Sequence, residues 1–218
     1  FLSNVANEND KKKEKMKAEL DPYKRFDWGV PPSSKGDYAF VLHMLSSLDS
    51  EGRMAVVLPH GVLFRGASEG KIRKKIIEFN LLDAVIGLPA NLFYGTGIPA
   101  CILVFKKNRT TKDVLFIDAS GEENFEKGKN QNILRSCDIE KIVTTYKNKE
   151  VIDKYSYLAS YEDIKENDYN LNIPRYVDTF EEEEMVDIEE VKKNIANIEN
   201  ELAEVQAQMK KYLEELGL

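Results

Sequence analysis

The sequence has little of what small stapled or metal-bound proteins require. Its 218 residues include 2 cysteines, without the paired spacing of a zinc site or a disulfide framework. Cys101 lies in an apolar run and Cys137 in a polar segment, so we expect two unpaired thiols and a reducing, cytoplasmic compartment. No apolar run approaches the roughly 20 residues that a membrane-spanning helix needs. The length and composition indicate either one globular domain with an appendage or two small units.

An initiator methionine and a secretion signal are also missing. The chain begins at Phe1, and the residues after it form neither a basic region nor an apolar signal core. We therefore expect this sequence to be the inner part of a longer protein.

A net positive charge is absent, since the formal net charge is −7. The acidic excess lies mostly in residues 181–184 and the segment behind them, whereas the middle of the chain is basic. Phosphate binding depends on the local field, so DNA stays a candidate partner. The alternative is that these basic residues are solvated helix faces and strand ends. They are Arg53, Arg65, Lys71, Arg73, Lys74, Lys75, Lys106, Lys107, Arg109 and Lys112.

The distribution of apolar residues divides the chain into four parts. Residues 1–35 are a polar lead-in loop, and residues 36–118 have the pattern of an α/β unit. Residues 119–185 are predicted to be a loop-rich connecting segment, with a helix near 138–147. Residues 186–218 form a heptad helix.

The α/β unit is predicted to contain a mixed sheet. Residues 54–58 and 83–88 are continuous apolar runs, typical of strands that are covered on both faces. A helix predicted at 67–79 joins them, which implies a parallel pair with a right-handed crossover. Residues 100–106 return after a loop and are expected to be antiparallel. Residues 114–118 are either an edge strand or a crossing segment.

A further helix is predicted from Asp37 onward by apolar residues at helical spacing. The residues of its expected apolar face are Phe40, Met44, Leu45 and Leu48.

The last segment repeats apolar residues by three and four, which predicts an a/d seam seeking a partner helix. The partner is either another helix of this protein, in a hairpin, or a second subunit. The seam residues are Ile188, Val191, Ile195, Ile198, Leu202, Val205, Met209, Tyr212 and Leu216.

An aromatic and glycine-rich loop separates the runs 83–88 and 100–106. Phe93 and Tyr94 lie beyond the end of a buried strand, where aromatic rings are well placed to hold a flat ligand such as a nucleobase. Gly95 and Gly97 would let the backbone turn tightly or approach a ligand closely.

Five segments resemble the modification subunit of type I restriction-modification systems: residues 35–44, 52–66, 83–96, 125–132 and 167–177. The family is similar to the amino-methyltransferases that methylate adenine N6 in DNA with S-adenosylmethionine. The resemblance implies the C-terminal half of a Rossmann-like methyltransferase mixed sheet, with parallel strands and an antiparallel last strand. A long C-terminal coiled-coil-type helix follows it.

Two features of that family are absent from this sequence. Its glycine-rich cofactor loop belongs to an earlier strand, and its catalytic Asn-Pro-Pro-aromatic motif is missing. Residues 30–33 contain two prolines but neither the asparagine before them nor the aromatic residue after them. We therefore expect no catalytic residue in this chain, and no methylation of DNA by this chain alone.

The resemblance also implies roles for named residues. Phe93 or Tyr94 would stack on an extruded base, with Gly95, Gly97 and Pro99 shaping the loop. The alternative is that the rings only pack under the loop. Contacts to the DNA backbone are expected from Arg65, Lys106, Lys107, Arg109, Lys127 and Lys129.

The expected partners are DNA, a specificity subunit bound through the C-terminal helix, a second modification subunit and a restriction subunit. A different reading is a non-catalytic assembly or DNA-clamp module, in which the aromatic and glycine residues only shape a loop. His60 follows a predicted strand and is expected to structure a loop rather than act as a base.

Overall fold

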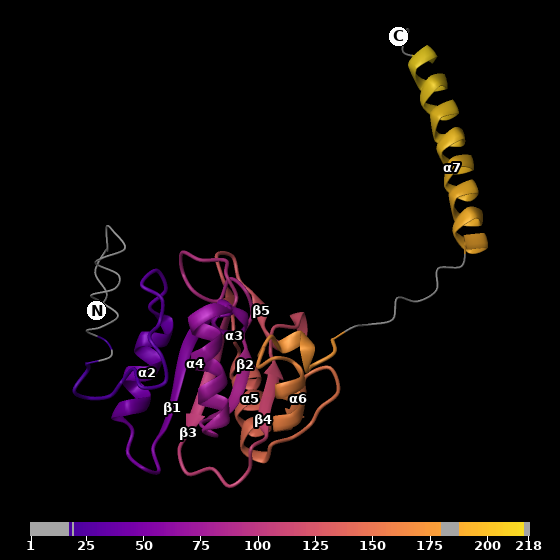
Figure 1. Ribbon diagram of the computed structural model, residues 1–218. Helices are drawn as coiled ribbons and strands as arrows, with labels where there is room; N and C mark the ends of the chain where they lie inside the picture. Colours follow the sequence, from indigo (N-terminus) through magenta and orange to yellow (C-terminus); the bar gives the residue numbers. More distant parts are fainter. Residues whose placement is uncertain (1–17, 19, 180–187, 216–218) are drawn as a thin grey trace. The chain divides into compact units, whose positions relative to one another are not determined.

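The computed structural model describes residue 18, residues 20–179 and residues 188–215 (Figure 1). The chain divides into two compact units, one ending at Thr179 and the other beginning at Phe180. The first unit is an α/β structure. The described part of the second unit is the helix α7 (Ile188–Glu215).

Strands and helices alternate in the first half of the α/β unit, and a small hairpin and further helices follow. The first half contains α2 (Asp37–Ser47), β1 (Arg53–Pro59), α3 (Gly61–Phe64), α4 (Ala67–Glu78), β2 (Leu82–Gly87), β3 (Ala100–Lys106) and β4 (Val114–Asp118). The second half contains η1 (Glu122–Asn124), β5 (Glu126–Lys127), β6 (Asn132–Ile133), α5 (Ser136–Asn148), β7 (Ser156–Ala159), α6 (Tyr161–Glu166) and η2 (Ile173–Arg175).

The main sheet is mixed, with the strand order β1-β3-β2-β4-β7. β3 lies between β1 and β2 and runs antiparallel to both, so β1 and β2 point the same way. β4 is parallel to β2, and β7 is antiparallel to β4. The predicted antiparallel direction of residues 100–106 is confirmed. β1 and β2 are not paired with each other, because β3 separates them.

Residues 114–118 form an interior strand, so the prediction of an edge strand or crossing segment is wrong. The strand that pairs with its outer side, β7, is too short to show an alternating pattern: Ser156 and Ala159 are its buried residues. Residues 119–179 therefore do more than connect, since they add β7 and α5 to the same unit. α5 confirms the helix predicted near 138–147.

Helices cover the two faces of the sheet unequally. Buried residues of α2 and α4 share one apolar cluster with Val85, Leu103 and Phe116 of the sheet. The other face packs Ala84 and Ile117 against α5, and Figure 1 shows α4 in front of the strands. Every residue of β2 is buried as a result, as the apolar run 83–88 predicts.

β1 is covered on one face only, which corrects the prediction for residues 54–58. Met54, Val56 and Leu58 face the cluster under α2 and α4, whereas the side chain of Val57 is 50% exposed. α5 packs over β2 and β4 and leaves the outer face of β1 open. Among the described residues, β1 has a strand partner on one side only.

The apolar face predicted for α2 is confirmed at Leu45 and in part at Leu48, and it is wrong at Phe40. Tyr38, Val41, Leu42 and Leu45 are its buried large residues, while Phe40 is 57% exposed. The Tyr38 hydroxyl donates a hydrogen bond to the Val62 carbonyl at 2.8 Å, which lets this polar ring lie in the core. Helical spacing alone does not show which side chains beside Leu45 complete the buried face.

α7 is a helix of 28 residues whose described seam residues are largely exposed within their own unit. Leu216 of the predicted seam lies outside the described residues. The exposed seam residues are Ile195, Ile198, Leu202, Val205, Met209 and Tyr212. Pairing with a second helix stays a prediction. Within the described ranges, no helix has the length and apolar character needed to cross a bilayer.

Near the start of β2, Asp83 is the centre of a largely buried network of charged side chains. Arg109 Nε lies 3.0 Å from Asp83 Oδ1, and Lys149 Nζ lies 3.1 Å from Asp83 Oδ2. The Tyr146 hydroxyl donates a hydrogen bond to Asp83 Oδ2 at 2.6 Å. Burial alone would raise the pKa of Asp83, but the Tyr146 hydroxyl and the two cations outweigh it and hold this pKa below its ordinary value.

Substitution Asp83→Ala should lower the free energy of unfolding by about 3–5 kcal/mol, because Arg109 and Lys149 lose their anion in a buried site. The measurement is urea denaturation followed by circular dichroism. Lys74→Ala removes an exposed pair with Glu78 and a cation–π contact with Tyr169 and serves as the control, with an expected loss of about 1–2 kcal/mol. Equal losses for the two variants would contradict this account.

The contribution of Asp83 to the free energy of unfolding depends on pH in a defined direction. Since the pKa of Asp83 is lowered by folding, its contribution is fully present above the unfolded carboxylate value of about 3.9. The contribution is lost as the pH falls through the folded-state pKa. On the acidic side, the stability difference between the wild type and Asp83→Ala should therefore narrow below about pH 4.

Candidate functional site

The aromatic loop connects the end of β2 to the start of β3. Its stem is closed by a hydrogen bond of 2.9 Å from the Leu88 N–H to the Ala100 carbonyl. Leu92 packs against the apolar cluster under α5 and anchors the loop. The next two rings point outward: Phe93 is 43% exposed and Tyr94 is 83% exposed. Neither ring is sealed in the interior.

A shallow pocket of about 260 Å³ lies at the carboxyl end of β1, beside this loop. Ligands of open α/β sheets gather at this edge. Phe93 forms part of the lining, whereas Tyr94 is not among the lining residues. The lining residues are Val57, Leu58, Pro59, Phe93, Thr96, Ile98, Pro99 and Ala100. The lining is almost wholly apolar and contains no charged side chain.

The loop uses its two glycines for different reasons. Gly95 has a φ of +75°, and a Cβ there would meet no atom within 4 Å, so its backbone conformation is what favours glycine. At Gly97 a Cβ would lie 2.9 Å from Asn91 Oδ1, so close approach is the constraint. Pro99 lines the pocket and leads into β3.

His60 lies at the same edge of the sheet. It follows β1, and its Nε2 lies 2.9 Å from the Ala100 carbonyl oxygen, where β3 begins. This contact ties the end of β1 to the base of the aromatic loop, which agrees with the loop-structuring role expected for this residue.

The hairpin formed by β5 and β6 lies against the aromatic loop. The backbone N–H of Asn132 donates to the Asn91 carbonyl, and its side-chain Nδ2 donates to the Ala90 carbonyl, both at 2.8 Å. Two segments that are far apart in the sequence therefore form one surface. No local pattern in the sequence indicates this contact, because a polar residue of a loop gives no sign of its partner.

Two of the predicted DNA-backbone residues lie on this hairpin. Lys127 pairs with Glu122 at 2.6 Å, and both side chains are well exposed. Lys129 is exposed at the turn between β5 and β6. The structure thus brings Lys127 and Lys129 to the same side of the unit as the aromatic loop.

The largely buried side chain of Arg65 forms ion pairs with two carboxylates. Its Nε lies 2.5 Å from Glu69 Oε2, and its Nη2 contacts Asp37. The hydrogen bond to Glu69, followed by that to Asp37, raises the pKa of Arg65. Its charge is therefore largely neutralised within α2, α3 and α4, which does not favour the predicted phosphate contact.

Lys106, Lys107 and Arg109 lie at the opposite end of β3 from the aromatic loop. A strand of this length spans about 20 Å. Lys107 donates to the Leu48 carbonyl, and the Arg109 side chain is 4% exposed in its pair with Asp83. The phosphate contact predicted for Arg109 is corrected: burial commits this side chain to the fold.

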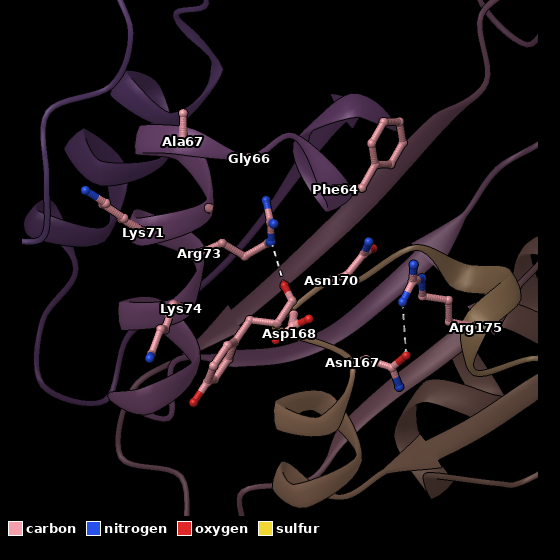
Figure 2. A pocket seen from close by; sticks show the side chains of 12 residues that line it. Phe64, Gly66, Ala67, Lys71, Arg73, Lys74, Asn167, Asp168, Asn170 and Arg175 are labelled. Carbon is pink, nitrogen blue, oxygen red and sulfur yellow. Dashed lines mark hydrogen bonds between the residues drawn. The ribbon is translucent and has the colours of Figure 1, made fainter.

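A second hollow, of about 400 Å³, lies between α4 and the segment 167–175 (Figure 2). The buried Arg73 side chain crosses beneath it, with Nε donating to the Tyr169 carbonyl at 2.7 Å and Nη1 to the Arg65 carbonyl at 2.9 Å. Figure 2 shows Lys71 and Lys74 pointing away from Arg73. The hydrogen bond from Arg73 to Tyr169 thus ties the segment 167–175 to α4.

The segment 167–177 also packs against the face of the sheet that α2 and α4 cover. The Tyr176 ring stacks on Phe116 with centroids 3.9 Å apart. A Cβ on Gly87 would lie 2.7 Å from Ile173 Cδ1, so the glycine at the end of β2 allows this close packing. The Leu171 N–H donates to the Leu63 carbonyl at 2.9 Å.

Both cysteines are unpaired, as predicted: Cys101 is buried and Cys137 is exposed. Burial raises the pKa of the Cys101 thiol to about 12, so it is not a reactive nucleophile.

Comparison with known proteins places these features in a family. The model of the family described as N-6 DNA Methylase matches residues 3–185. A curated relative from Mycoplasma pneumoniae, the type I restriction enzyme MpnII methylase subunit, is 38% identical over 188 residues, which cover 86% of this chain. The HindI methylase subunit of Haemophilus influenzae is 34% identical over 226 residues, covering 98% of this chain.

A solved structure of a methyltransferase subunit has a similar fold. The type I restriction-modification system methyltransferase subunit from Streptococcus thermophilus is 56% identical, with a TM-score of 0.72. The match covers 76% of this chain and 35% of that chain. This chain spans 34% of the M. pneumoniae relative and 51% of the H. influenzae relative.

Proposed function

Because the chain belongs to the N-6 DNA methylase family, we propose that it is part of the modification subunit of a type I restriction-modification system. The complete subunit would transfer a methyl group from S-adenosylmethionine to adenine N6 in DNA. The observation that carries this proposal is the aromatic loop beside an apolar pocket at the carboxyl edge of β1, with Phe93 in its wall.

Adenine inside a duplex cannot be reached, so the base must be extruded and held by stacking. Phe93 is proposed to stack on the extruded base, with Tyr94 beside it in a more exposed position. Gly95, Gly97 and Pro99 shape the loop. Phe93 supplies a flat apolar face, and the neighbouring Ile98 and Val57 complete the pocket wall.

The exocyclic amine of adenine is a weak nucleophile, since its lone pair is delocalised into the ring. In the family, an Asn-Pro-Pro-aromatic motif accepts the amine hydrogens, and that motif is not in this sequence. This chain would thus contribute to positioning the base rather than to activating it.

The pocket does not fit S-adenosylmethionine. Its lining has one hydroxyl residue, Thr96, and no acidic or basic side chain to meet the charged ends of the cofactor. The cofactor supplies the methyl group when it is bound, and we assign no residue of this chain to hold it.

The proposed partners are DNA, the specificity subunit, a second modification subunit and the restriction subunit. Lys127 and Lys129 would contact DNA phosphates next to the extruded base, and the exposed seam of α7 would dock on the specificity subunit. A cytoplasmic location is in keeping with the two unpaired thiols.

In the full-length protein, Phe93→Ala should lower kcat/KM for methylation about 5- to 150-fold, the range expected for one lost stacking contact. The double variant Phe93→Ala with Tyr94→Ala should abolish methylation. Transfer of labelled methyl groups to DNA is the measurement, and size-exclusion chromatography with the specificity subunit shows that assembly is intact. Unchanged methylation by the double variant would remove the base-stacking role and favour the reading in which these residues only shape the loop.

Removal of the hairpin charges should change the salt dependence of DNA binding. For Lys127→Ala with Lys129→Ala, the slope of log affinity against log salt should become shallower by about 2. Fluorescence anisotropy at several salt concentrations measures this slope. Lys106→Ala, at the opposite end of β3, is the matched control and should leave the slope unchanged. Equal slopes for the double variant and the wild type would show that these two lysines do not contact DNA phosphates.

Charge placed in the seam of α7 should prevent docking. Ile195→Asp with Leu202→Asp puts two carboxylates on the apolar face, so affinity for the specificity subunit should fall at least about 100-fold. Isothermal titration calorimetry measures this loss. The control is Asn197→Asp with Asn200→Asp, which adds the same charge off the seam. Retained binding by the seam variant would indicate an intramolecular helical pair.

A further inference from the structure

We propose that Asn132 is a positioning residue for the base-stacking loop, holding the Phe93 ring at the pocket through the backbone of residues 90 and 91. This inference rests on the proposed function of the loop. Asn132 is not in the pocket lining, so its effect on methylation would be transmitted through the loop.

The geometry gives Asn132 control over orientation as well as position. Its backbone N–H and its side-chain Nδ2 donate to two consecutive carbonyls, Asn91 and Ala90, each at 2.8 Å. Two bonds from one residue to neighbouring peptide units restrict rotation about the chain, which a single bond would allow. Asn91 adopts a left-handed conformation with a φ of 53°, so this clamp lies at the bend directly before Leu92 and Phe93.

The other contacts of the loop lie at different points along it. The Leu88 N–H and His60 both bond to the Ala100 carbonyl at the stem, and the Ile98 N–H bonds to Thr96 Oγ1 on the far side of the rings. Among the hydrogen bonds of the described residues, those from Asn132 reach the loop on the side that leads into Phe93. Only Leu92 separates the clamp from the ring.

The hairpin that presents Asn132 is itself well supported. Asn132 pairs with Lys127 across the two strands. A Cβ on Gly128 would lie 2.3 Å from the Gln131 carbonyl, so the turn requires glycine. Beyond β6, Arg135 joins the Glu123 carbonyl and the Asp138 carboxylate of α5, at 2.8 Å and 2.9 Å. The clamp is therefore fixed to the rest of the unit.

In the full-length protein with its specificity subunit, Asn132→Ala keeps the backbone bond and removes the side-chain donor. We expect kcat for methylation to fall about tenfold, with DNA affinity unchanged, because the loop still exists but the ring is misplaced. Asn130→Ala is the matched control, since its exposed side chain lies at the turn of the same hairpin. Equal kcat values for the two variants would overturn the proposal.

A double-mutant cycle separates positioning from other effects. If Asn132 acts through Phe93, adding Asn132→Ala to Phe93→Ala should cause no further loss, whereas multiplied losses would overturn the proposal. A silent Phe93→Ala would overturn the stacking role and the positioning role together. An impaired Phe93→Ala with a silent Asn132→Ala would overturn the positioning role alone.

A second variant covers the case in which Asn132→Ala does not fold. Asn132→Asp keeps the side-chain size but has no hydrogen to donate to the Ala90 carbonyl, so it should show the same loss of kcat. Wild-type kcat in a folded Asn132→Asp protein would overturn the proposal.

Discussion

The antiparallel pairing of β3 with both β1 and β2 is the constraint on which the site depends. β3 begins beside the carboxyl ends of these strands, at the pairs Pro59 with Ala100 and Gly87 with Cys101. The connection from β2 to β3 must therefore lie across that edge. Since ligands of open α/β sheets bind there, the topology itself places the aromatic loop beside the pocket.

Distant backbone contacts then give this loop its shape. Asn132 and His60 hold it from outside through carbonyl groups, while Leu92 is its apolar anchor. A loop has few buried side chains to define its conformation, and its backbone groups need partners. The hairpin at β5 and β6 supplies such partners, which explains why a small polar element belongs to an apolar site.

The basic residues of the chain divide into two groups once they are folded. Arg65, Arg73 and Arg109 serve the fold, because their guanidinium groups bond to carboxylates and carbonyls inside the unit. Lys127 and Lys129 are exposed on the hairpin beside the loop. A buried cation needs carboxylate or carbonyl partners inside the protein, so counting basic residues overstates the surface that can attract DNA.

The sequence by itself determined the strands and helices with strong patterns, the antiparallel return of β3, the family and the aromatic loop. Apolar periodicity and local motifs depend on residues that are close together in the chain, so the sequence shows them directly. The tertiary structure alone decided which residues of α2 are buried beside Leu45, that β1 is open on one face, and that Asn132 meets Asn91. It also showed that Arg109 belongs to Asp83 rather than to a phosphate. These facts depend on pairs of residues far apart in the chain, and neither member of such a pair carries a local sign of the other.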